Sequence, residues 1–305
     1  MEVDFEFRKE RKLGEIVQDF INLLRQILQH FFQTILKLAI LPLCLMLILI
    51  YYGTTKINLT SNESWIDSLD IILIGVAVVI TLLLVSMVFF GLAIEYFILL
   101  KNRRQTDFDS RDVWQGFVAN LGKYLKFLLV SIVASIILFI PLMFAMIVVM
   151  FIPLVGNFAV GILTTFVGVW FFCALLFYRE GYVSATNSIQ QSFNILKKKI
   201  IDYSMSAYVV SLVFQMLLLM LTLIPSLIIG LIAYNTIGFE QTFFDSVFGR
   251  LFTALGGVLL VLLYIVYYMF TVLVSGIIYE SAKEMAYGED LYEKIENLGK
   301  EENEH

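Results

Sequence analysis

Three glutamates form the only arrangement in this sequence that suggests a site: Glu95, Glu180 and Glu280. Each stands at the end of a long hydrophobic run and has a tyrosine within two residues. Carboxylates that gather beside basic helices could gate a cavity, bind a partner or act on a lipid headgroup. Alternatively, each glutamate anchors the end of its own helix and pairs with a nearby cation such as Arg103 or Arg179. The sequence leaves both interpretations open.

Little polar chemistry lies inside the hydrophobic runs. Gln215 is the most polar side chain in the middle of a run, and Ser206 and Thr164 are among the hydroxyl residues that accompany it. Such side chains hydrogen-bond between helices more often than they line a pore. A cavity lined by these three residues would favour transport or lipid handling, whereas a close-packed bundle would favour a scaffold.

The sequence does not contain the residue motifs that metal sites, cofactor sites and several kinds of enzyme require. The only histidines are His30 and His305, and both cysteines, Cys44 and Cys173, lie in apolar runs. There is no Cys-x-x-Cys, no histidine pair at helical spacing, no P-loop, no glycine-rich dinucleotide fingerprint and no Gly-x-Ser-x-Gly turn. We therefore expect no metal, no cofactor, no disulfide framework and no enzymatic activity. The net charge of −5 says little about nucleic acid, which we do not expect as a partner.

The elements that must position the glutamates belong to a membrane protein. Hydrophobic residues make up 60% of the chain and charged residues 15%, and the mean hydropathy is +0.86. No charged residue or histidine occurs in 127–178, 203–239 or 251–279. Because a helix needs roughly 20 apolar residues to cross a bilayer, these runs predict an all-α polytopic membrane protein with six transmembrane helices. The expected spans are about 31–52, 69–100, 125–152, 157–178, 203–233 and 250–279.

The basic residues predict the orientation. With the N-terminus in the cytoplasm, all but Lys56 and Arg250 of the 21 lysines and arginines fall on the cytoplasmic side. Six crossings return the C-terminus to the same side, so we expect both termini to be cytoplasmic in the cell inner (plasma) membrane. Residues 1–30 would form a cytoplasmic segment with an interfacial helix, and residues 280–305 an acidic tail. One run could be re-entrant instead of spanning.

Three amphipathic stretches precede the odd-numbered spans: 13–32, 114–126 and 182–200. Each has apolar residues at helical spacing on one face and predicts an interfacial helix whose basic side chains reach lipid headgroups. A proline also recurs in each odd span, at positions 42, 141 and 225. Together with the three glutamates, this suggests a threefold internal repeat; biased composition can also produce such a pattern by chance.

The segment 179–197 is similar to a pattern in the integral-membrane domain that accompanies glycerophosphodiester phosphodiesterases, and in related uncharacterised six-span bacterial inner-membrane proteins. The residues that carry the resemblance are Glu180, Ala185, Ser192, Phe193, Leu196 and Lys197. No phosphodiesterase domain follows the last expected span in this sequence. The resemblance therefore implies a bacterial inner-membrane domain and no activity.

These observations predict a non-enzymatic scaffold or accessory subunit that acts through membrane lipids or a membrane-protein partner. The alternative is a transporter or lipid-handling protein with a cavity among the proline-containing helices. An enzyme acting on a lipid headgroup would need Glu95, Glu180 and Glu280 within a few ångströms of each other beside a pocket.

Overall fold

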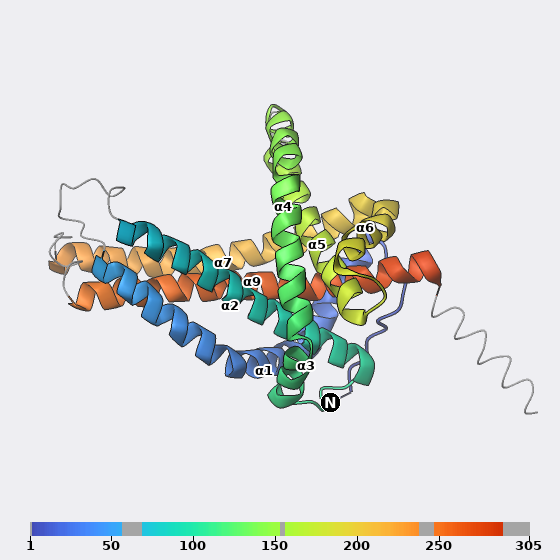
Figure 1. The fold of residues 1–305 in the computed structure, drawn as a ribbon, viewed down its shortest axis with the longest axis horizontal. Helices are drawn as coiled ribbons and strands as arrows, with labels where there is room; N and C mark the ends of the chain where they lie inside the picture. Colours follow the sequence, from blue (N-terminus) through green and yellow to red (C-terminus); the bar gives the residue numbers. More distant parts are fainter. Residues whose placement is uncertain (1, 57–68, 153–155, 238–246, 289–305) are drawn as a thin grey trace, which may run out of the picture. The chain divides into compact units, whose positions relative to one another are not determined.

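The computed structural model describes residues 2–56, 69–152, 156–237 and 247–288, which are almost entirely α-helical (Figure 1). The helices are α1 (Leu13–Lys56), α2 (Leu69–Arg103), α3 (Ser110–Ala119), α4 (Leu121–Met150), α5 (Gly156–Glu180), α6 (Ala185–Leu196), the short 3₁₀ helix η1 (Lys197–Lys199), α7 (Ile200–Ile237) and α9 (Val247–Tyr287). Within these ranges the only β-type pairing is an isolated bridge between Glu2 and Gln105.

Six helical stretches are long and apolar enough to cross a membrane: Leu13–Gly53, Ile72–Arg103, Leu121–Met150, Gly156–Glu180, Ala185–Leu223 and Gly249–Tyr287. The predicted class, an all-α polytopic membrane protein, is confirmed. The protein is therefore a multi-pass integral membrane protein.

The predicted amphipathic stretches meet their spans in different ways. The first is continuous with its span in α1, whereas the second is divided between α3 and α4 at Asn120. Capping side chains set the starts of the short helices: Asp109 accepts hydrogen bonds from two backbone N–H groups of α3, and Ser184 accepts one in α6. The third stretch reaches α7 through the Lys197–Lys199 turn.

The apolar stripe of α1 packs against protein. Ile16, Phe20, Ile27 and Phe31 are all buried, while Leu28 on the flank of the stripe is exposed. The ring of Phe31 lies 4.9 Å from that of Tyr96 on α2. This stripe therefore contributes to the core and is not available to lipid.

Two compact units divide the chain. The first comprises Met1–Thr34, Gly91–Leu212 and Phe270–His305, and the second comprises Ile35–Phe90 and Val213–Met269. Helices α1, α2, α7 and α9 therefore each contribute one end to each unit, whereas α3 to α6 belong to the first alone. In the second unit, the side chain of Gln215 donates a hydrogen bond to the Tyr267 hydroxyl at 3.1 Å.

The first unit includes a chain segment that precedes α1, the N-terminal segment (residues 2–12). Its Val3 and Phe7 are buried, and the Val3 N–H donates to the carbonyl of Arg104 at 2.9 Å. Arg11 is 1% exposed, and its guanidinium donates to the carbonyls of Glu6, Phe7 and Lys9 and to the Asp19 carboxylate. The N-terminal segment is thus fixed within the unit.

Helix α9 extends past the predicted end of the last span at residue 279. It continues to Tyr287, and Glu280, Ser281, Ala282 and Lys283 are buried in the first unit. The packed domain thus includes residues assigned above to the acidic tail, because this turn of α9 joins the ion pairs described below. Residues 289–305 lie outside the described residues.

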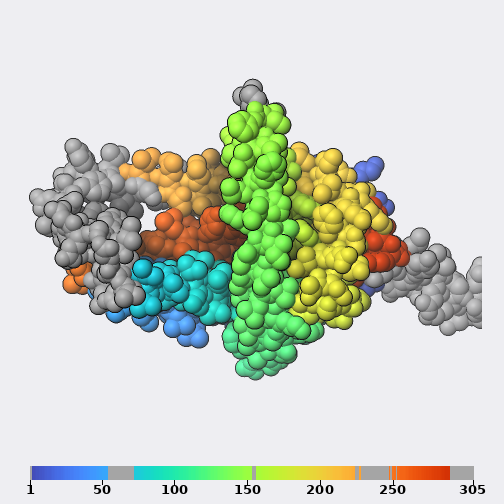
Figure 2. Space-filling view, turned by 45° about the horizontal axis from the view of Figure 1, so that its top comes forward, coloured from blue at the N-terminus to red at the C-terminus, as the bar shows by residue number. Residues whose placement is uncertain are grey.

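Among the six described stretches that could cross a membrane, α4 is the one whose most apolar part has no buried residue. Ile136, Ile140 and Phe144 are 67%, 74% and 70% exposed, and Figure 2 shows the green surface of α4 uncovered along its length in that view. Pro42 and Pro141 lie inside α1 and α4, which continue through them, and α7 continues through residue 225. The threefold repeat remains a prediction.

Candidate functional site: a buried ion-pair cluster

Glu95 is held by three hydrogen bonds in the first unit. The Arg179 guanidinium donates from Nε to Oε1 at 2.5 Å and from Nη2 to Oε2 at 2.8 Å, and the Tyr124 hydroxyl donates to Oε1 at 2.7 Å. This two-point pairing matches the planar guanidinium to the planar carboxylate. Glu95 of α2 thereby links α4 and α5, and its side chain is only 2% exposed.

Lys101 joins the other two glutamates. Its ammonium lies 2.5 Å from Oε1 of Glu180 and 2.9 Å from Oε1 of Glu280. Glu180 also accepts hydrogen bonds from the Tyr279 hydroxyl at 2.5 Å and from Lys283 at 3.3 Å. The ends of α2, α5 and α9 are therefore connected through one lysine.

We call these six residues the ion-pair cluster: Glu95, Lys101, Arg179, Glu180, Glu280 and Lys283. Three carboxylates face three cations, so the cluster carries no net charge. None of the six side chains is more than 19% exposed. Buried charges are tolerated when each is paired and hydrogen-bonded, and the cluster meets that condition.

Small residues allow the helices to approach closely around the cluster. A Cβ atom on Gly116 of α3 would lie 2.8 Å from Oε2 of Glu95, and one on Gly276 of α9 would lie 2.6 Å from the ring of Phe97. The lack of a side chain at Gly116 and Gly276 thus leaves room for the Glu95 carboxylate and for the Phe97 ring.

The structure brings two of the three predicted glutamates to one cation, and joins Glu95 to the cluster through Arg179, the neighbour of Glu180 in the sequence. The predicted alternative was that each glutamate pairs with a cation near the end of its own helix, but Arg179 lies on α5, 84 residues from Glu95 along the chain. Arg103 instead pairs with Asp107 and Asp112.

The cluster also contains Lys101 and Lys283, and its glutamates accept hydrogen bonds from Tyr124 and Tyr279. Sequence reasoning singled out neither lysine as a glutamate partner, nor Tyr124. The two lysines could not be recognised in the sequence, because lysines near the ends of hydrophobic runs are common on the cytoplasmic side of any membrane protein. The tyrosines adjoining the glutamates were the better sign, since a buried tyrosine hydroxyl needs a partner.

Ser206 and Thr164 belong to the first unit. Gln215 belongs to the second unit, whereas the ion-pair cluster lies in the first. Ser206 donates to the carbonyls of Asp202 and Leu13, and Thr164 to carbonyls within α5. Their hydroxyl groups therefore satisfy backbone oxygens. Among the described residues, no group of three or more His, Cys, Asp and Glu side chains could hold a metal ion.

A cavity of about 350 Å³ adjoins the cluster. It is lined by Phe177, Tyr182, Val183, Gln191, Lys283 and Tyr287. The Lys283 ammonium lies 4.9 Å from the centre of the Tyr182 ring and 5.4 Å from that of Tyr279, so it contacts aromatic faces as well as Glu180. This cavity presents aromatic surface and one already paired cation.

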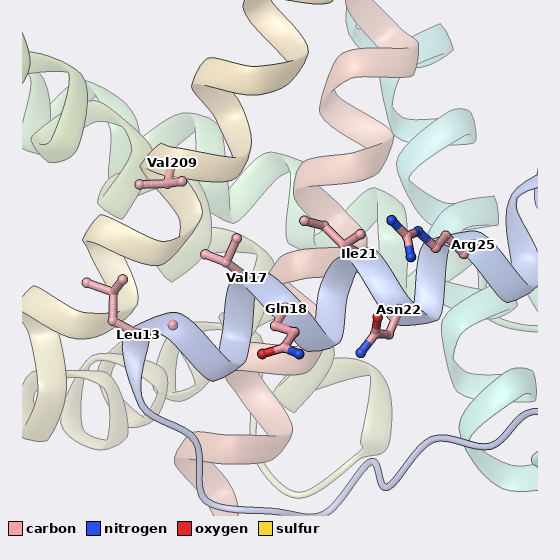
Figure 3. A pocket seen from close by; sticks show the side chains of 8 residues that line it. Leu13, Val17, Gln18, Ile21, Asn22, Arg25 and Val209 are labelled. Carbon is pink, nitrogen blue, oxygen red and sulfur yellow. The ribbon is translucent and has the colours of Figure 1, made fainter.

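Two other hollows in the first unit are mainly apolar. One of about 470 Å³ lies between the start of α1 and Val209 of α7; Figure 3 shows Leu13, Val17 and Ile21 facing Val209, with Gln18, Asn22 and Arg25 along the same helix. The second, of about 500 Å³, is lined by residues of α4, α5 and α7 that include Ala145, Val149, Ala159, Leu163, Ile201 and Met205.

The segment that carries the family resemblance has a clear place in the first unit. Glu180 belongs to the ion-pair cluster, and Ala185, Ser192 and Leu196 are buried where α6 packs on α5. The resemblance to the phosphodiesterase-associated membrane domain remains a prediction. Comparisons of the chain with protein-family models, with curated proteins and with solved structures found no match.

Proposed function

We propose that the protein is a non-enzymatic scaffold or accessory subunit of a cell inner membrane, surrounded by membrane lipids and acting by binding a partner protein. The observation that supports this is the closed ion-pair cluster. Glu95 and Glu180 each accept three hydrogen bonds from arginine, lysine or tyrosine, and the 2% exposed Glu280 shares Lys101 with Glu180. All three carboxylates are therefore paired with cations of the protein itself. The cluster suits the task of holding helix ends in one arrangement.

The surface for the partner is the aromatic cavity beside the cluster. Tyr182 is 60% exposed and Tyr287 is 47% exposed, so both can contact another protein. Aromatic residues around a hollow of this kind are typical of positions that dominate binding energy at protein interfaces. An aliphatic or aromatic side chain of the partner would fit there.

The test is mass spectrometry of the full-length protein released from its native membrane in lipid nanodiscs. We expect a stoichiometric partner protein with the unchanged protein, and its loss with Tyr182→Ala. Trp114→Ala is the matched control, because Trp114 is an exposed aromatic residue of α3 outside the cavity. Absence of any stoichiometric protein, or equal retention by both variants, would contradict the proposal.

One observation favours lipid handling as a second candidate. The hollow of about 500 Å³ between α4, α5 and α7 has almost entirely apolar walls, as a site for an acyl chain requires. The same mass spectrometry should then find one enriched lipid in place of a partner. Ala159→Trp would fill the hollow and lower that enrichment, whereas Ile136→Trp on the exposed surface of α4 would not.

A further inference from the structure

Helix α6 runs back along α5. The Trp170 indole N–H donates to the carbonyl of Ile189 at 2.7 Å, the rings of Phe166 and Phe193 lie 6.3 Å apart, and those of Phe177 and Tyr182 lie 6.2 Å apart. As the residue number falls from 177 to 166 along α5, the number of its neighbour rises from 182 to 193 toward and along α6. The two helices are therefore antiparallel neighbours.

This path places three lysines beside the middle of α5. The Lys197–Lys199 turn follows Phe193 and precedes Ile200 and Ile201, which line one hollow together with Leu163. Lys197 and Lys198 are exposed, and Lys199 pairs with Glu10 at 2.6 Å. The turn that carries these lysines thus passes α5 near residue 163.

The far end of this part of α5 is also charged. From Leu163 to Glu180 the helix rises by about 25 Å, which approaches the thickness of the hydrocarbon layer. If α5 crossed the bilayer from the cluster outward, the lysine turn would lie deep in the membrane or near its opposite surface. Lysines in the hydrocarbon layer are costly, and lysines are favoured on the cytoplasmic side.

The N-terminal segment connects the lysine turn with the ion-pair cluster at the end of α5. Glu10 binds Lys199, and the next residue, Arg11, donates its backbone N–H to Ser281 at 2.9 Å, beside Glu280 of the ion-pair cluster. The start of α1 is tied to the same region, since Ser206 of α7 donates to the carbonyl of Leu13 at 3.2 Å. The lysine turn and the cluster therefore belong to one polar layer.

We infer that α5, together with α4, lies along the membrane surface that holds Lys197–Lys199 and does not cross to the other side. Helix α4 follows α5, because Lys123 donates to the carbonyl of Arg179 at 3.2 Å and the Phe127 ring stacks 6.2 Å from that of Tyr178. The acyl chains of that leaflet cover the bare side chains of α4. Helices α1, α2, α7 and α9 supply four crossings, an even number.

Depth measurements along α4 test this inference. Cys44 and Cys173 are replaced by alanine, and single nitroxide labels are placed at Leu129→Cys, Ile136→Cys and Phe144→Cys, all exposed positions. The labelled protein is studied in phosphatidylethanolamine–phosphatidylglycerol vesicles with oxygen and a water-soluble nickel complex as relaxing agents. We expect the three labels to lie at nearly the same depth. A crossing helix would separate the first from the last by about 20 Å.

Helix α7 provides the matched series, at Val213→Cys, Met220→Cys and Leu227→Cys, which are also exposed. Depth should change steadily along this series. A steady change along α4 as well would overturn the inference. A label at Asn157→Cys, in the first turn of α5, gives a second check. Its relaxation by nickel complex supplied only on the side that Lys56→Cys reports would also overturn the inference.

Discussion

The six charged residues of the ion-pair cluster contribute unequally to the stability of the first unit. Lys101 faces two carboxylates, and its side chain is 13% exposed. Lys283, by contrast, contacts Glu180 at 3.3 Å and also lies against aromatic rings. Because a buried charge without its partner is costly, the loss of Lys101 should destabilise the first unit most.

For Lys101→Met we expect a loss of roughly 3–5 kcal/mol, because Glu180 and Glu280 would then be buried together without their shared cation. The measurement is thermal unfolding in detergent, followed by the fraction that remains monodisperse. Lys126→Met is the control, since Lys126 is exposed, and it should unfold within a degree or two of the unchanged protein. Adding Glu280→Gln to Lys101→Met should restore part of the loss; no recovery would contradict the shared-cation interpretation.

Glu95 and Arg179 should be energetically coupled. In a double-mutant cycle of Glu95→Gln and Arg179→Met, we expect a coupling of about 1–3 kcal/mol, because each change leaves the other group without its charged partner. The comparison cycle uses Arg103→Ala and Asp112→Ala, whose partly exposed pair should give under about 1 kcal/mol. Equal couplings in the two cycles would mean that burial adds nothing to the Glu95 pair.

At the scale of the elements, the sequence predicted which segments are helical better than it predicted where those helices pack. Apolar runs without charge predicted the long helices. Helical spacing predicted the apolar stripe of α1 but assigned it to the membrane interface, whereas the structure buries it against protein. The path of α6 could not be predicted, because its apolar face fits lipid and the side of α5 equally well. The shared role of Lys101 could not be predicted either, since its two partners, Glu180 and Glu280, lie 79 and 179 residues after it along the chain.

Close helix packing leads to a prediction about glycine. Gly276→Ala on α9 should lower stability by roughly 1–3 kcal/mol, because its new methyl group would meet the buried ring of Phe97. Gly168→Ala on α5 is the matched control: nothing lies within 4 Å of a Cβ there, so the change should be neutral or stabilising by up to about 1 kcal/mol. The same unfolding assay distinguishes them, and a Gly276→Ala protein as stable as Gly168→Ala would argue against the tight contact.

At the scale of the whole molecule, an even number of crossings leaves both termini on one side. Protease-cleavable tags at the two ends should therefore be cut only in inverted vesicles, and not in intact spheroplasts. The N-terminal tag needs a flexible linker, because Val3 and Phe7 are buried. Cleavage of one tag from each side would require an odd number of crossings and would contradict the predicted orientation.

The hydrogen bond between Arg11 and Ser281 links residues 270 positions apart. During synthesis Arg11 leaves the ribosome long before Ser281 exists, by roughly 15–50 s at 5–20 residues per second. Until then the backbone N–H of Arg11 lacks this partner, and the apolar residues of the N-terminal segment lack the cover that α9 provides. Helix α9 therefore completes the environment of the N-terminal segment, and a chain that stalls before α9 would expose that segment to proteases.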